Sequence, residues 1–213
     1  QEFGLVFPQG RKNFEEEMVT RFSTWKRGDL DGVPDLVWKQ MKRLFKKIKE
    51  HNQEIERYER EIVKHSKKDK RVLLAQSVTG VGVLGSSLIC ASVSDFRVFR
   101  NGRHFSSYLG LVPKHVGTGG KNRMLGISKR GNKNIRQLLV HGARSVLVGA
   151  LSALKSRGGD IKKLSAVQRW VLQVRQVRGW NKACVAMANK IARIVYRVVR
   201  DGVAYDPKKA ALA

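Results

Sequence analysis

The sequence predicts an all-α fold, in which a long coiled-coil segment precedes a basic helical domain. Three observations lead to this prediction. Apolar residues recur with heptad spacing through 37–65, and they recur at steps of three or four through 135–154 and 181–200. A glycine turn also separates two apolar stretches within 71–94. Steps of three and four place apolar side chains on one face of a helix, so each stretch is expected to be helical.

The first helix is expected at 11–27. It ends where the turn-rich residues 28–32 precede Pro34. Its apolar positions are Phe14, Met18, Phe22 and Trp25.

The second helix is expected to be long and to pair with another helix. Its apolar or semi-apolar positions alternate steps of four and three over about four heptads, and Lys and Glu flank them. A two-chain coiled coil and an intramolecular helical hairpin fit this pattern equally well, and a homo-oligomer is one expected consequence. The positions are Val37, Met41, Leu44, Ile48, His51, Ile55, Tyr58, Ile62 and His65.

The charge is concentrated in the second part of the chain. The whole sequence has 43 Lys and Arg against 17 Asp and Glu, a formal net charge of +26. Residues 1–69 contribute +3 and residues 70–213 contribute +23. We therefore divide the chain into a coiled-coil or linker segment at 1–69 and a basic domain at 70–213. Nucleic acid is the expected partner, since the basic residues are not gathered into one lipid-facing helix.

Cysteine usage and hydropathy suggest a protein of the cytoplasm. Cys90 and Cys184 lie in apolar runs without metal-ligand spacing, which predicts buried free thiols in a reducing compartment. No signal peptide is visible, and no apolar run is expected to reach the roughly 18 residues that a membrane span needs.

Residues 71–94 predict a helix-hairpin-helix element. Gly80-Val81-Gly82 forms the hairpin between two apolar helices, and exposed amides in such hairpins commonly bind a DNA phosphate without reading sequence. A Gly-x-Gly turn also occurs as plain packing, so both readings stay open for Gly80 and Gly82.

The stretch 111–136 combines basic residues with five glycines, two hydroxyls and no carboxylate. Glycine lets backbone N–H groups turn toward a bound anion, and the cations neutralise it. We expect a glycine-rich loop that binds a phosphate chain; a flexible, solvated basic loop is the alternative. The basic residues are Lys114, Lys121, Arg123, Lys129, Arg130, Lys133 and Arg136, and the hydroxyl residues are Thr118 and Ser128.

Three helices are expected after this loop, at 135–154, around Trp170 and at 181–200. The last has a cationic stripe that is expected to have no acids nearby to pair with, which favours a nucleic-acid face over a solvated one. Its basic residues are Lys190, Arg193, Arg197 and Arg200. The aromatic residues expected in the core, with base stacking by one of them as the alternative, are Phe96, Phe99, Phe105 and Tyr108.

Several strings together resemble the C-terminal half of the DEDD-type transposases. This is insertion-sequence family 110, subgroup 1111, which is related to the Piv invertase. The matching strings are Gly80-Val81-Gly82, 105–113, Thr118-Gly119-Gly120-Lys121, 126–132, 138–144 and 186–193.

The resemblance implies a DNA recombinase that acts through a covalent protein–DNA intermediate and is guided by a structured noncoding RNA. Such transposases have an N-terminal RuvC-like domain with four metal-binding acids, where Mg²⁺ is expected, and a C-terminal domain with a serine nucleophile. This sequence has no counterpart of the RuvC-like portion, so this chain alone is expected to be inactive. The implied location is the bacterial cytoplasm, in association with the nucleoid.

The family's nucleophilic serine lies about five residues after the proline of Leu-Val-Pro, and Thr118 holds that place. A threonine hydroxyl can attack phosphorus, although its methyl group crowds the approach. Thr118 is therefore the candidate nucleophile and Ser128 the second candidate. Gly119 and Gly120 belong to the same motif, and the residues expected to hold the scissile phosphate are Lys121, Arg123, Lys129 and Arg130.

A catalytically inactive nucleic-acid-binding fragment, or relic of such an element, is the main alternative. It predicts salt-sensitive binding without any covalent product. A structural dimeriser acting through the heptad positions alone fits less well, because of the charge of +23 in the second part.

Overall fold

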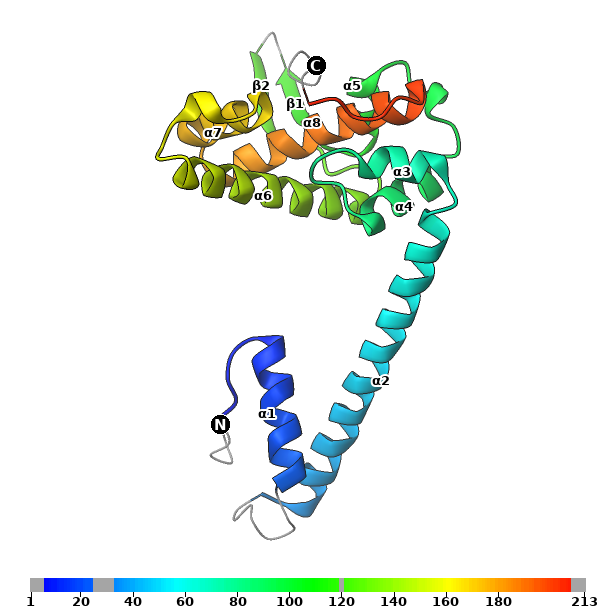
Figure 1. The fold of residues 1–213 in the computed structure, drawn as a ribbon, viewed down its shortest axis with the longest axis vertical. Coiled ribbons are helices and arrows are strands. Elements are labelled where there is room, and N and C mark those ends of the chain that lie inside the picture. The colour runs from blue at the N-terminus through cyan, green and yellow to red at the C-terminus, as the bar shows by residue number, and fades with distance from the viewer. Residues whose placement is uncertain (1–5, 25–32, 119–120, 208–213) are drawn as a thin grey trace. The chain divides into compact units, whose positions relative to one another are not determined.

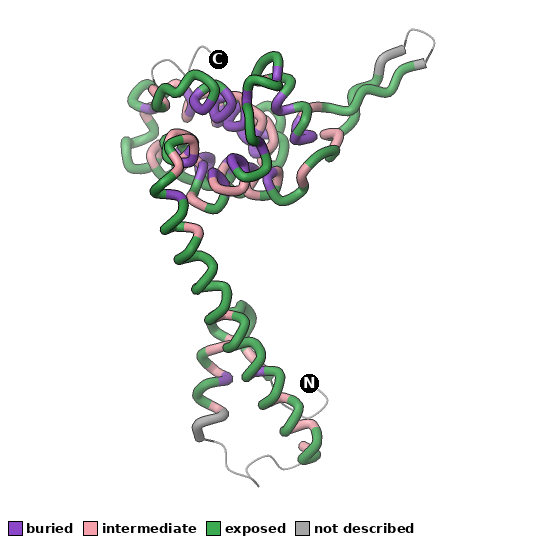
Figure 2. The backbone as a smooth tube through the Cα atoms, turned by 90° about the vertical axis from the view of Figure 1, so that its right-hand side faces the viewer, coloured by how far each residue is buried: buried purple, intermediate pink, exposed green. Residues whose placement is uncertain are grey.

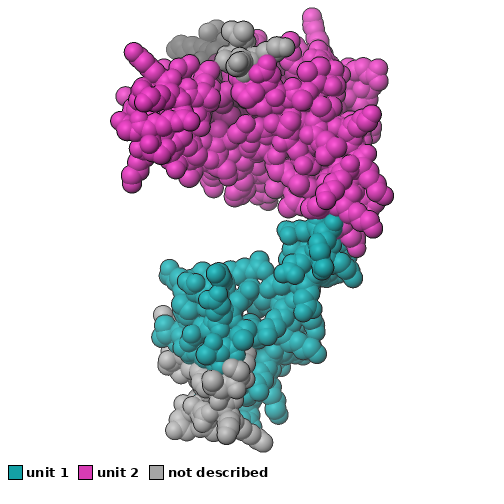
Figure 3. Space-filling view, viewed as in Figure 1, with its two compact units in different colours: residues 1–60 teal, residues 61–213 magenta. Residues whose placement is uncertain are grey.

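The computed structural model describes residues 6–24, 33–118 and 121–207, with side chains throughout except at 22–24, 118, 121 and 122. It divides into two units, Gln1–Arg60 and Glu61–Ala213 (Figure 3). The predicted fold class is confirmed as predominantly helical. The described residues also contain one small two-stranded sheet, which the sequence analysis did not predict.

Unit 1 contains helix α1 (Arg11–Thr24) beside the first part of helix α2 (Asp35–Ser66), as Figure 1 shows. Asn52 ties the two helices together, because it accepts a hydrogen bond from Arg11 and its Nδ2 donates to Glu15 Oε1 at 3.1 Å. The end predicted for the first helix, including Trp25 and the turn at 28–32, lies outside the described residues.

The heptad positions of α2 are mostly exposed in this chain. The buried residues in the described part of this unit are Met18 of α1 and Phe45 of α2, and Phe45 is not one of the heptad positions. Phe45 lines the same hollow as Val19 of α1. Leu44 is 58% exposed and Ile55 is 50% exposed. The long helix is therefore confirmed, and its first part forms an intramolecular hairpin with α1. A coiled-coil partner for the remaining heptad positions stays a prediction.

Unit 2 is built around helix α8 (Trp180–Asp201), which has buried residues on most of its faces. Its alanines allow close approach of neighbouring helices, and α3, α5, α6 and α7 all pack against it (Figures 1 and 2). The other elements are α3 (Lys70–Gln76), α4 (Val83–Ser92), η1 (Phe96–Val98), α5 (Gly102–Tyr108), β1 (Pro113–Thr118), β2 (Lys121–Ile127), α6 (Lys133–Ser156), η2 (Ile161–Lys163) and α7 (Ala166–Arg178).

The helices predicted at 135–154, around Trp170 and at 181–200 are confirmed as α6, α7 and α8. The expectation that no apolar run is long enough for a membrane span was wrong for α6, which is long and apolar enough by length and composition alone. Its apolar face is part of the core, in contact with α8. The buried residues of that face are Ile135, Leu139, Ala143, Val146, Leu147 and Ala150.

Three of the four predicted core aromatics are buried. Phe96 and Phe99 pack around Phe105, with ring centroids 5.5 and 5.1 Å from it. The expectation for Tyr108 was wrong, because its side chain is 45% exposed. It lies at the last turn of the short helix α5, where its ring contacts only the edge of the cluster, 5.2 Å from Phe99.

Both cysteines are buried free thiols, as predicted. Burial raises the pKa of the Cys90 thiol to about 11. At pH 8 this leaves a thiolate on about one molecule in a thousand, and the thiolate is the nucleophile. We expect iodoacetamide to leave Cys90 unlabelled in the native chain and to label it in urea, as followed by mass spectrometry. Rapid labelling of native Cys90 would contradict this packing.

Candidate nucleic-acid interface

The predicted glycine-rich loop is in large part a β-hairpin. Strands β1 and β2 are antiparallel, with Val116 opposite Arg123, and a bulge lies between Pro113 and His115. Thr118 ends β1 and pairs with Lys121 at the start of β2, while Gly119 and Gly120 lie outside the described residues. Figure 2 shows the two strands extending away from the rest of unit 2, with most of their described residues exposed.

A tight backbone contact fixes the base of the hairpin. Lys129 N donates to Gly110 O at 3.1 Å, and Ser128 N donates to Val112 O at 2.9 Å. Gly131 has φ +80°, and a Cβ there would lie 2.0 Å from Tyr108 O. Only glycine allows this approach, so the segment 128–131 is held against the end of α5.

Helix α6 begins directly after this contact. The Asn132 side chain accepts hydrogen bonds from the backbone N–H groups of Asn134 and Ile135, at 2.9 and 3.1 Å. Arg136 Nη1 donates to Leu109 O and to Arg130 O, each at 3.1 Å. Arg136, predicted to bind nucleic acid, therefore joins the basic segment to α5 and is half-buried.

We expect Asn132→Ala to lower the free energy of unfolding by about 1 kcal/mol, because it removes the cap of the longest helix in the described part of unit 2. Urea unfolding followed by circular dichroism measures this loss. Asn134→Ala is the matched control, since Asn134 is exposed and only its backbone takes part in the cap. Equal losses in both variants would argue against the cap.

The exposed cations of this region have no carboxylate beside them. Among the described residues no acid lies between Asp95 and Asp160 in the chain, and none forms an ion pair with the hairpin or the segment 128–133. Their charges are therefore available to a polyanion. The exposed basic side chains are Lys114, Arg123, Lys129, Arg130 and Lys133.

The Gly80-Val81-Gly82 turn between α3 and α4 lies apart from the hairpin. Gly80 packs on the middle of α6, where a Cβ on Gly142 would meet Gly80 O at 1.7 Å. Position 142 is roughly 15 Å along the helix from Asn132, at 1.5 Å per residue. Gly80 thus has a packing role, while Gly82 is exposed at the start of α4 without a side-chain cap.

The cationic stripe of α8 differs from the prediction in two ways. Lys190 is buried at 9% exposure and lies 5.1 Å from the centroid of the Trp170 ring, and burial lowers its pKa, with a smaller contribution from Arg193. Arg197 is exposed but forms an ion pair with Asp201 at 3.5 Å. The expectation of no acid partner was wrong because Asp201 is one helical turn away. Arg193 is half-buried.

Comparison with known proteins identifies the segment that carries the hairpin. Residues 73–157 match the Transposase IS116/IS110/IS902 family. The chain contains a domain of this transposase family. The matched segment extends from α3 through the hairpin to the end of α6. Helix α8 lies outside this segment and supplies much of the core against which the segment packs.

Three relatives agree with this transposase assignment. The chain is 34% identical over 199 residues to the transposase for insertion sequence element IS1111A of Coxiella burnetii, covering 93% of this chain and 51% of the relative. It is 37% identical over 171 residues to a probable family 20 transposase of Pseudomonas aeruginosa, covering 78% and 48%. It is 30% identical over 209 residues to the transposase for insertion sequence element IS1328 of Yersinia enterocolitica, covering 96% and 56%. The chain spans about half the length of these curated relatives.

One residue that supports the hairpin of the transposase domain was not predicted as a site residue, and Tyr108 was considered only as one of four aromatics that could stack on a base. Asn189 of α8 donates through Nδ2 to Leu111 O at 3.1 Å and to Ser106 Oγ at 3.3 Å, so it fixes the chain just before β1. Tyr108 is exposed beside the segment 128–131. The sequence signals for Asn189 were its polarity between the apolar positions of α8 and its place in the matching string 186–193, and none distinguished Tyr108 from the buried aromatics.

Proposed function

We propose that this chain is the part of an insertion-sequence transposase that supplies the hydroxyl nucleophile for cutting and rejoining DNA. The observation that supports this most directly is the exposed basic hairpin within a transposase domain. Thr118 is the last residue of the first strand of this hairpin. We further propose that the reaction forms a covalent hydroxyl–phosphate intermediate and that a structured noncoding RNA selects the DNA.

In the proposed step, the Thr118 hydroxyl oxygen forms a bond to phosphorus while the bond from phosphorus to a sugar oxygen breaks. The threonine hydroxyl gives up its proton and the departing sugar oxygen gains one. Rejoining reverses this exchange with a sugar hydroxyl of the second DNA, so no oxidant or reductant is needed. Cations near the phosphate stabilise the charge that develops on its other oxygens.

The segment 128–131 is suited to hold a neighbouring phosphate of the same DNA, because it lies at the base of the hairpin, five strand residues or roughly 16 Å from Thr118. Lys129 has φ +56°, a left-handed conformation that costs a lysine about 1 kcal/mol or more. The hydrogen bonds and glycines around it hold this conformation, which points to a positional requirement for the residue. Arg130 and Lys133 are exposed on either side of Gly131. These groups, with Lys114 and Arg123 on the hairpin, would bind the backbone around the cut.

The described residues do not fit a catalytic metal site. No group of three or more His, Cys, Asp or Glu lies close enough among them to hold a metal ion. We propose that divalent metal, expected to be Mg²⁺, is bound by an acidic RuvC-like domain outside this chain.

We propose that the intact protein forms a homo-oligomer through α2 in the bacterial cytoplasm, associated with the nucleoid. The exposed heptad positions of α2 support a second helix packing there. The exposed apolar residues on these positions are Leu44, Ile48, Ile55 and Tyr58.

The test is to assemble this chain with the acidic domain, the noncoding RNA and donor and target DNA, and to look for a protein–DNA adduct on a denaturing gel. We expect an adduct that requires both the chain and the acidic domain. Salt-sensitive binding with no adduct in the complete assembly would favour the inactive nucleic-acid-binding fragment and overturn the proposed reaction.

A further inference from the structure

Four arginines meet in a second basic site, at the end of unit 2 where α5 begins beside the last turns of α8. We call it the arginine pocket and define it by Arg103, Arg193, Arg197 and Arg200. It is an open hollow of about 370 Å³ that is also lined by Asn101, Gly102 and Tyr196.

The pocket is built by close packing between two elements that are far apart in sequence. Gly102 lies against the backbone of α8, where a Cβ would meet Arg193 O at 3.1 Å and Arg193 Cα at 3.2 Å. Tyr196, buried at 3% exposure, donates its hydroxyl to Phe99 O at 2.7 Å. These contacts fix Arg103 and Arg193 on the same hollow.

One carboxylate pairs with two of the four guanidinium groups. Asp201 pairs with Arg200 at 2.7 Å and with Arg197 at 3.5 Å. Arg200 also donates to the Tyr196 hydroxyl at 3.2 Å and lies over the Tyr196 ring, which fixes its guanidinium in place. Within the described part of the chain, neither Arg103 nor Arg193 has a carboxylate within 4 Å. The pocket therefore has an excess of positive charge that is held in position.

We propose that the arginine pocket binds the phosphate backbone of duplex DNA next to the segment that is cut. Guanidinium groups bind phosphate oxygens in pairs of hydrogen bonds. The pocket offers no exposed aromatic ring for stacking, since Tyr196 is buried, so it contacts the backbone without reading bases. This inference rests on the proposed function, because DNA is its ligand.

The position of the pocket on α8 fits this assignment. Asn189 holds the base of the hairpin, and Arg193 and Arg200 follow it by four and eleven residues. These separations correspond to roughly 6 and 16 Å along the helix. At 3.4 Å per base pair, these separations correspond to about two to five base pairs for a duplex that lies along α8.

The test measures binding of the 213-residue chain to a duplex DNA probe by fluorescence anisotropy over a range of salt concentrations. The variant Arg103→Gln/Arg193→Gln should bind roughly tenfold more weakly at 0.15 M salt. Its slope of log K against log salt should be shallower by about 1.8, because two phosphate contacts are lost. Arg103→Gln alone, at an exposed position, should give about half of the slope change. Circular dichroism checks that each variant is folded.

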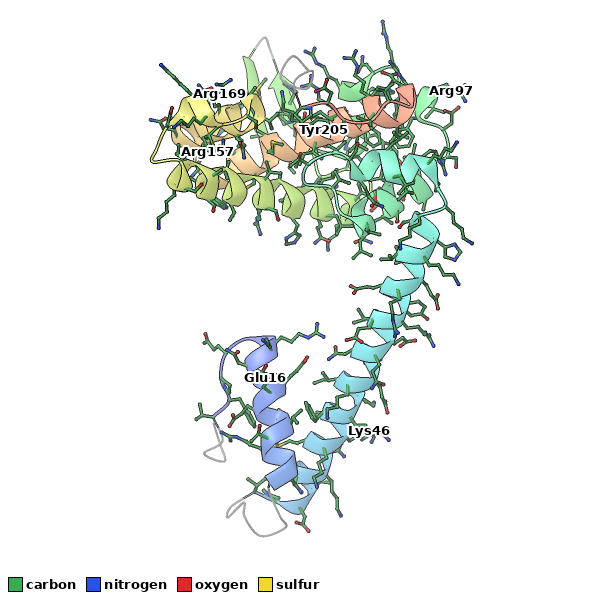
Figure 4. All side chains as sticks on the ribbon, viewed as in Figure 1. Glu16, Lys46, Arg97, Arg157, Arg169 and Tyr205 are labelled. Carbon is green, nitrogen blue, oxygen red and sulfur yellow. The ribbon has the colours of Figure 1, made fainter. Side chains whose placement is uncertain are left out.

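The matched control is Lys155→Gln/Lys162→Gln, which removes the same charge near the end of α6. Figure 4 marks that end of the unit with Arg157 and Arg169, opposite the end marked by Arg97. Equal losses in both double variants would show a general charge effect and overturn the pocket. The pocket would also be overturned if the arginine variant bound duplex DNA like the parent chain and lost only its binding to duplex RNA of the same sequence.

The adduct assay separates this inference from the proposed function. If the complete assembly forms an adduct while the arginine variant binds DNA like the parent chain, only the pocket is wrong. If the arginine variant shows the specific loss but no adduct ever forms, the pocket stands and the proposed reaction fails.

Discussion

Thr118→Ala is expected to lower the yield of the protein–DNA adduct at least about a hundredfold in the complete assembly. Alanine has no oxygen to attack phosphorus, and removing a nucleophile usually costs several orders of magnitude in rate. DNA binding should change little, because the exposed cations of the hairpin and of segment 128–133 remain. The measurement is the band shift on a denaturing gel, with binding followed separately by anisotropy.

Three further variants define this result. Thr118→Ser should form the adduct at least as well as the parent chain, because serine keeps the hydroxyl and removes the crowding methyl group. Ser152→Ala, on the exposed side of α6, controls for loss of a surface hydroxyl. An adduct that survives Thr118→Ala and disappears with Ser128→Ala would move the nucleophile to Ser128.

Gly142→Ala should have the largest effect on stability. Alanine normally favours a helix over glycine by about 1 kcal/mol. Here its Cβ would lie 1.7 Å from Gly80 O, so the α3–α4 turn must move. Overpacking of this kind costs about 1–3 kcal/mol or more, which outweighs the helix preference. We expect Tm to fall by about 5 °C or more in a thermal melt.

Gly149→Ala is the matched control in the same helix. A Cβ at Gly149 would meet nothing within 4 Å, so only the helix preference acts. Tm should rise by about 2 °C, which corresponds to 0.5–1 kcal/mol in a domain of this size. If Gly142→Ala stabilised the protein as Gly149→Ala does, the contact between the α3–α4 turn and α6 would be wrong.

The helices could be predicted from the sequence because their signal is local. Steps of three and four residues located α6 and α8 to within a few residues. The hairpin could not be predicted in this way. Glycines and cations interrupt any alternation of apolar and polar residues in 113–127, and a ladder of hydrogen bonds between two strands leaves no local pattern when both are exposed.

The candidate site was only partly predictable for the same reason. The run of cations without acids identified the basic region, since charge can be counted along the chain. Burial of Lys190 and the meeting of Arg103 with Arg193 depend on how α5 and α7 pack on α8. Such contacts join residues that are distant in sequence, and no periodicity reports them. The ion pair of Arg197 with Asp201 is different, because its spacing of four residues within one helix can be found in the sequence.

The most direct test of the proposed function is to find the residue that carries the DNA. Trypsin cuts after Lys114, Lys121, Arg123 and Lys129, so Thr118 falls in the peptide 115–121 and Ser128 in the peptide 124–129. Each peptide has a single hydroxyl residue. We expect mass spectrometry of the nuclease-trimmed adduct to find the nucleotide on 115–121. A nucleotide on 124–129, or on any peptide outside the hairpin, would contradict Thr118 as the nucleophile.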